Sequence, residues 1–112
     1  MAVSRRAEVA VHGRPAGILE EIEPGRAYRF EYLPDYDGHP VSLTLPIEDR
    51  EHVFTEFPPF FDGLLPEGIQ LEALLRLRKI DADDFFSQLL AVGADLVGTT
   101  TLSELEATGN GA

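Results

Sequence analysis

The chain is short, acidic and free of cysteine. Its 112 residues suit a single domain, and a chain of about this length buries roughly two-thirds of its unfolded surface without help from disulfides or metal. The absence of cysteine excludes disulfides, thiolate metal sites and cysteine nucleophiles, and it suits a reducing cytosol. Twenty acidic residues against nine basic ones give a net charge of −11, which repels nucleic-acid phosphates and attracts basic partners. We therefore expect no direct binding of DNA or RNA.

No stretch of the sequence has the character of a membrane or export segment. Arg5 and Arg6 near the start are followed by no apolar core of a signal peptide, and no apolar run approaches the roughly 18 residues of a membrane helix. We interpret these two arginines as solubilising charges. The expected location is the cytoplasm.

The first half of the sequence predicts four β-strands separated by turns. Tyr28, Phe30 and Tyr32 share one side of the third strand, which indicates a half-buried antiparallel strand. Pro46 ends the fourth strand because it removes a backbone donor. The charged stretch 47–56 is predicted to be a surface excursion. The predicted strands cover residues 7–11, 16–22, 26–33 and 41–45.

The second half predicts helices and a closing strand. A short helix is expected near residues 60–64, and a second from Pro66 to about Lys79, with one face formed by Leu71, Leu74 and Leu75. Residues 96–102, rich in valine and threonine, predict the closing strand.

The third helix is predicted from its end signals. Asp81 is the expected N-cap, with Ile80 and Phe85 as a hydrophobic staple, and Gly93 is the expected C′ residue. The predicted buried stripe consists of Phe85, Phe86, Leu89 and Leu90.

This order of elements predicts an α+β domain. We expect a small antiparallel sheet or partial barrel, made from the N-terminal strands plus the closing C-terminal strand and packed with two or three helices. The domain is predicted to span residues 1–103, and residues 104–112 to form a flexible tail.

The sequence contains no recognisable catalytic or metal-binding constellation. Residues 93–100 carry the two glycines of a phosphate-binding loop, but Thr99 stands where the lysine is required. His12, His39 and His52 lie far apart in predicted turns or loops, where solvent exposure explains them. We expect no enzymatic activity, no cofactor and no metal.

Residues 57–68, here called the Phe-rich segment, are too apolar for an ordinary connector. At helical spacing Phe61 and Leu64 are expected in the core. Phe57 and Phe60 lie beside prolines that stiffen the backbone, and this favours them as exposed anchors for a partner. The pattern leaves two roles open for the segment: core of the helical half, or docking surface.

Several motifs together resemble the N-terminal subdomain of HipA-type kinases over roughly residues 7–103. They occur in the family's order and at similar spacing. They are residues 40–46, residues 60–68, Asp84-Phe85-Phe86 with Leu89-Leu90, and residues 93–98. HipA-type proteins are serine/threonine kinases that act as toxins beside a DNA-binding HipB-type antitoxin. The kinase machinery lies C-terminal to the matched subdomain, so the resemblance carries no catalytic residue to this chain.

A separate copy of this subdomain resembles the small HipS-type protein of three-part HipB–HipS–HipT systems. The resemblance implies a non-catalytic toxin–antitoxin component that restrains a HipA- or HipT-like kinase, with a HipB-like protein as a possible third subunit. The alternative is a split kinase subdomain needed for kinase folding or activity. Residues expected to contact the kinase are Phe57, Phe60, Leu64, Leu65, Pro66 and Glu67.

Overall fold

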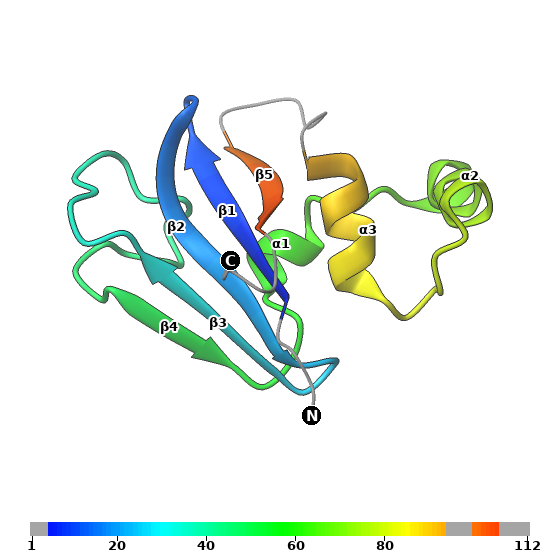
Figure 1. The fold of residues 1–112 in the computed structure, drawn as a ribbon, viewed down its shortest axis with the longest axis horizontal. Coiled ribbons are helices and arrows are strands. Elements are labelled where there is room, and N and C mark those ends of the chain that lie inside the picture. Colours follow the sequence, from blue (N-terminus) through cyan, green and yellow to red (C-terminus); the bar gives the residue numbers. More distant parts are fainter. Residues whose placement is uncertain (1–4, 94–99, 106–112) are drawn as a thin grey trace.

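The computed structural model describes residues 5–93 and 100–105, and these form one antiparallel sheet with three helices beside it (Figure 1). The strand order is β4-β3-β2-β1-β5. The N-terminal strand β1 is therefore paired on both sides, by β2 and by the C-terminal strand β5. This architecture confirms the predicted α+β fold with a closing C-terminal strand. The elements are β1 Arg5–Val11, β2 Arg14–Glu23, β3 Ala27–Tyr32, β4 Glu51–Phe54, α1 Pro59–Asp62, α2 Gly68–Arg78, α3 Phe85–Val92 and β5 Thr100–Leu105.

The core lies between the helix-covered face of the sheet and helices α1 and α3. Alternation along β3 buries Tyr28, Phe30 and Tyr32 on this face, as the sequence predicts. Gly17 of β2 gives the Phe30 ring its space, because an added β-carbon would lie 2.6 Å from that ring. The close approach of ring and backbone explains a glycine in a central strand.

Residues 41–45 do not form the predicted fourth strand. Only a bridge between Ser42 and Leu45 is present, and the intervening Leu43 is 95% exposed. The buried Tyr32 hydroxyl holds this turn, because it accepts a hydrogen bond from the Val41 amide at 2.9 Å and donates one to the Leu45 carbonyl. The alternating apolar residues therefore mark two buried ends of a tight turn and its exposed tip.

The fourth strand lies instead within the stretch that was predicted to be a surface excursion. Strand β4 pairs with β3 through Tyr28↔Phe54, Arg29↔Val53, Phe30↔His52 and Glu31↔Glu51. It is an edge strand whose residues are half-buried or exposed. Its charged composition hides the strand period, which is why the sequence pattern misses it.

Helix α3 begins later than predicted, and its cap is Asp84 rather than Asp81. The Asp84 carboxylate accepts a hydrogen bond from the Ser87 amide, while the Asp81 carbonyl accepts from the Asp84 amide in the preceding turn. The Ile80–Phe85 staple, which assumed Asp81 as the cap, is wrong for the same reason. Of the predicted stripe, Phe86 and Leu89 are buried, Leu90 is half-buried and Phe85 is exposed.

Gly93 ends α3, but its backbone is right-handed, with φ −56°. Gly93 is therefore the C-cap residue, and not the C′ residue that was predicted. A β-carbon added at Gly93 would lie 2.7 Å from the carbonyl oxygen of Leu102, so a glycine is needed for the close approach of α3 to β5. The left-handed helix end occurs instead at Lys79 after α2, with φ 55° and ψ 48°.

Strand β5 extends to Leu105, beyond the predicted end at residue 102. Residues 104 and 105, which were assigned to the tail, are therefore in the sheet. The first four residues of the predicted strand, 96–99, and the rest of the tail lie outside the described residues. Within the described ranges no helix is both long and apolar enough to cross a membrane.

Candidate partner-binding surface

The Phe-rich segment joins the sheet to the helices, and it contains both buried and accessible side chains. Phe57 is 8% exposed and Phe61 is fully buried. The Phe57 ring meets the Tyr28 ring edge to face, with centroids 5.4 Å apart, and the Phe61 ring lies 5.9 Å from that of Phe30. The prediction that Phe57 is an exposed anchor is therefore wrong, because this side chain fills the space between β3 and α3. The prediction that Phe61 is core is confirmed.

The other predicted contact residues lie nearer the surface. Phe60, Leu64, Leu65 and Pro66 are half-buried and Glu67 is exposed. We call these five residues the Phe60 surface. Pro58 and Pro59 start α1, and Pro59 occupies a first-turn position where no amide is needed.

Tight backbone hydrogen bonds continue past α1 and fix this surface. The Leu64 amide donates to the Phe61 carbonyl and the Leu65 amide to that of Asp62, each at 3.1 Å. The Phe60 ring packs edge to face on Phe61, with centroids 5.1 Å apart. A buried ring therefore anchors the accessible one, which preorganises the surface.

A small apolar cavity opens beside Phe60. It has a volume of about 150 Å³, well below the roughly 300–1,000 Å³ of a site for a small molecule. One apolar side chain of a partner would fit its size better. The sequence does not predict that Thr44 and Leu45 line this cavity, because residues 41–45 were predicted to form a strand. The cavity is lined by Thr44, Leu45, Phe54, Pro58, Pro59 and Phe60.

A partly buried ionic network holds α3 on the sheet. Arg5 of β1 donates hydrogen bonds to Glu21 Oε1 at 2.6 Å, to Asp84 Oδ1 at 2.9 Å and to Ser87 Oγ at 2.7 Å. The Tyr28 hydroxyl donates to the other Glu21 oxygen, and the Arg5 guanidinium lies 5.0 Å from the Phe86 ring centroid. Arg5 is therefore a structural tie, and not the simple solubilising charge expected from the sequence.

The network also changes the acidity of Asp84. Desolvation alone would raise its pKa, but hydrogen bonds from Arg5 and Ser87 outweigh burial and hold the pKa below its ordinary value. Asp84 therefore stays ionised while it caps α3 and pairs with Arg5. Burial raises the pKa of the Tyr28 hydroxyl, which remains a proton donor to Glu21.

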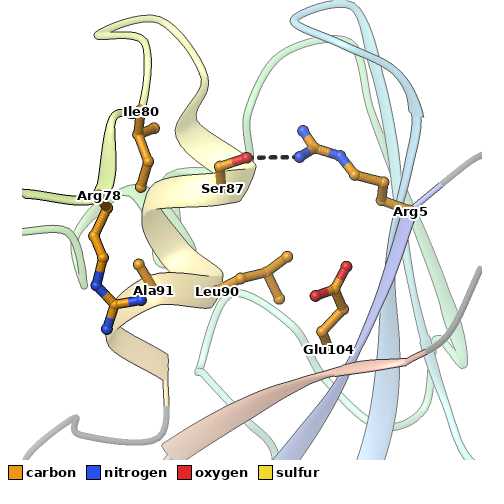
Figure 2. Close-up of a pocket in the computed structure, with 7 residues that line it drawn as sticks. All are labelled: Arg5, Arg78, Ile80, Ser87, Leu90, Ala91 and Glu104. Carbon is orange, nitrogen blue, oxygen red and sulfur yellow. Dashed lines mark hydrogen bonds between the residues drawn. The ribbon is translucent and has the colours of Figure 1, made fainter. Parts of the chain in front are cut away.

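A second cavity, of about 310 Å³, lies between α3, the end of α2 and β5. Figure 2 shows the Arg5–Ser87 hydrogen bond at one end, and Leu90 between Arg78 and Glu104. Arg78 and Glu104 form no ion pair with each other in the described part of the chain. Of its polar side chains, Arg5 and Ser87 belong to the network that holds α3 on the sheet.

The histidines do not assemble into a site. The His12 and His39 rings meet edge to face with centroids 6.4 Å apart, while a His52 ring nitrogen lies 3.1 Å from the Pro46 carbonyl oxygen. Among the described residues, no group of three or more histidine, aspartate or glutamate side chains is placed to hold a metal ion.

These features define a small α+β domain with a strongly tied core and an accessible apolar segment. The sequence model of the family described as HipA N-terminal domain matches residues 7–103. The chain therefore belongs to the HipA N-terminal domain family. That domain on its own is a non-catalytic subdomain.

The chain is also similar to a solved structure and to individual proteins. A solved structure, "N-terminal domain of HipA toxin", is 35% identical with a TM-score of 0.73, over 91% of this chain and 93% of that one. An "Uncharacterized protein" of Haemophilus influenzae (strain ATCC 51907 / DSM 11121 / KW20 / Rd) is 34% identical over 89% of this chain and 92% of its own length. "Putative kinase Y4dM" of Sinorhizobium fredii (strain NBRC 101917 / NGR234) is 29% identical over 88% of this chain but only 26% of its own length.

Proposed function

We propose that this protein is a non-catalytic component of a bacterial type II toxin–antitoxin system. In this proposal it acts in the cytoplasm, where it binds a HipA- or HipT-like serine/threonine kinase and restrains it. The observation that carries the proposal is the match of nearly the whole chain, in sequence and fold, to the N-terminal domain of a HipA toxin. A domain that is one part of a larger toxin in one protein is suited to bind the remaining part when it is supplied separately.

The Phe60 surface is the proposed contact with the kinase. It combines a half-buried aromatic ring, two half-buried leucines and a rigid backbone beside a cavity of about 150 Å³. Aromatic anchors beside pockets often dominate binding energy, and a preorganised segment loses little entropy on binding. Exposed Glu67 would supply a polar contact at the rim. A HipB-like DNA-binding protein is a possible third subunit, since the net charge of −11 disfavours direct DNA contact by this chain.

Kinase activity measured with and without this protein tests the proposal. The assay uses a HipA- or HipT-like kinase that lacks its own N-terminal subdomain. We expect a stable complex and inhibition of autophosphorylation on titration to a 1:1 ratio. Absence of a complex at micromolar concentrations would contradict binding. Rescue of an otherwise inactive kinase would instead favour the alternative, in which this chain is a split subdomain needed for kinase folding or activity.

Phe60→Ala tests the contact surface, and Phe61→Ala is the matched control. Both remove a phenyl group from α1, but Phe61 is fully buried whereas Phe60 is only half-buried. If Phe60 is an anchor, its truncation weakens kinase binding by about 2 kcal/mol or more while the fold survives. A Phe60→Ala protein that binds normally but melts as early as Phe61→Ala would assign Phe60 to the core.

A further inference from the structure

Helix α2 exposes a continuous apolar stripe that the fold leaves uncovered. Ile69 is 84% exposed, Leu77 is 80% exposed, and Ala73 between them is also exposed. Because these positions are spaced by four residues, they lie on one face of the helix. We call Ile69, Ala73 and Leu77 the α2 stripe.

The other side of α2 is apolar as well. Leu71, Leu74 and Leu75 are half-buried on the side that was predicted to pack, and no residue of α2 is fully buried. Figure 1 shows α2 at the edge of the molecule, outside α3 and away from the sheet. A helix that is apolar on two sides is normally buried on both. An isolated helix of 11 residues is also marginal in water.

The end of α2 carries unpaired positive charge. Arg76, Arg78 and Lys79 are exposed, and none has an ion pair among the described residues. By contrast, the ion pairs on the rest of the protein involve Arg5, Arg14, Arg26 and Arg29. The helix dipole favours cations at this end but does not require three of them.

We propose that the α2 stripe inserts into an apolar groove with an acidic rim on the kinase. This inference rests on the proposed function and adds a second contact to the Phe60 surface. The two contacts are neighbours in the sequence, since Ile69 follows Glu67 by two residues. Ile69 and Leu77 act as anchors, and small Ala73 lets the helix approach the groove wall closely. Arg76 and Lys79 face the acidic rim, whereas Arg78 lines the cavity beside α3.

Charge favours the kinase over a second copy of this chain as the occupant. Two copies would each carry a net charge of −11 and would repel one another. At the end of α2 the local charge is positive, so a groove whose rim is acidic at this point is favoured over one whose rim is basic there.

Isothermal titration of the kinase that lacks its own N-terminal subdomain with the full chain tests the inference. The double variant Ile69→Ala/Leu77→Ala removes both anchors and keeps a strong helix former at each position. Val53→Ala is the matched control, because Val53 is also an exposed apolar residue, 68% exposed, but lies on the edge strand β4. We expect the double variant to raise Kd by at least about tenfold, and the control to stay within about twofold of the wild type.

A charge variant supplies an independent arm. Arg76→Glu/Lys79→Glu is expected to slow association with the kinase, with an effect that shrinks as salt is added. Wild-type affinity in both double variants would overturn the inference and leave the proposed function standing. Absence of binding by the wild-type protein would overturn both. Sedimentation that shows a dimer of this chain, lost in Ile69→Ala/Leu77→Ala, would identify a second copy as the occupant and also overturn the inference.

Discussion

The sheet and helix α2 bury their apolar residues to very different extents. In the sheet, Ala7, Val9, Leu19 and Phe30 are all completely inaccessible, whereas α2 contains no buried residue. Local stability in a protein follows such differences, and mobile or binding elements are drawn from its less stable part. The contrast indicates a division of labour: the sheet with α1 and α3 holds the fold, and α2 is available to a partner.

The Phe-rich segment connects the sheet to α2. Phe57 and Phe61 point inward and join the core, while Phe60 and Leu64 stay partly accessible. Different residues of the same short stretch thus supply part of the core and the accessible face that we propose as the contact with the kinase.

The largest effect on stability is expected from truncation of a buried residue in the Phe-rich segment. Phe61→Ala removes a completely buried ring that contacts Phe30 and Phe60. We expect a loss of about 3–5 kcal/mol in the free energy of unfolding, measured by urea denaturation. A loss below about 1 kcal/mol would mean that α1 does not contribute to the stable core formed with the sheet and α3.

A somewhat smaller effect is expected from the ionic network that holds α3 on the sheet. Arg5→Met keeps most of the side-chain volume over Phe86 but leaves Glu21, which is 4% exposed, without its cation. Removing one partner of a buried charge pair leaves the other desolvated, so we expect a loss of about 2 kcal/mol or more. Glu21→Gln in the same background is the control and should restore part of the stability, because a neutral amide is less costly to bury. A wild-type melting temperature in Arg5→Met would show that α3 does not depend on this network.

A pH-dependent effect is expected at Asp84. Its folded pKa is depressed, so its contribution to stability is fully present above its unfolded pKa, about 3.9, and is lost as the pH falls through the lower folded value. Asp84→Asn retains an N-cap for α3 but loses the charge that pairs with Arg5. Because the carboxylate is partly exposed, we expect a loss of about 1 kcal/mol or less at pH 7. Urea denaturation of both proteins from pH 7 to pH 2.5 should show that the difference shrinks in acid. A constant difference would rule out the carboxylate charge as its source.

The smallest effect is expected on the outward side of α2. Ile69→Ala and Leu77→Ala change exposed residues that the fold does not use. We expect each to alter the free energy of unfolding by no more than about 0.5 kcal/mol. A larger loss in thermal unfolding would mean that the α2 stripe is covered within this chain and is not free for a partner.

The sequence predicts the fold class and most elements because their signals are local. The alternation in β3 and the closing strand follow from residue period and composition. Errors occur where a distant group decides the structure. The Tyr32 hydroxyl converts residues 41–45 from a strand into a turn, and Arg5 selects Asp84 over Asp81 as the anchored start of α3.

The candidate site was only partly predictable for the same reason. Apolar composition identifies the Phe-rich segment, but burial of Phe57 depends on Tyr28 and Phe85, which lie elsewhere in the sequence. The spacing of Leu71, Leu74 and Leu75 predicts the packed side of α2, and these three residues are half-buried. The spacing of Ile69, Ala73 and Leu77 was visible as well, but only the structure places it on an uncovered face.

Amide hydrogen exchange of this protein with and without a HipA- or HipT-like kinase tests the central claim most directly. The difference in burial between the sheet and α2 predicts slow exchange in β1, β2 and β3 of the free protein and fast exchange in α2. On addition of kinase, protection should rise from Phe60 through Lys79 and stay unchanged at His12 and Gly13, in the turn between β1 and β2. Protection that appears only at this turn, or nowhere in the described residues, would contradict the account.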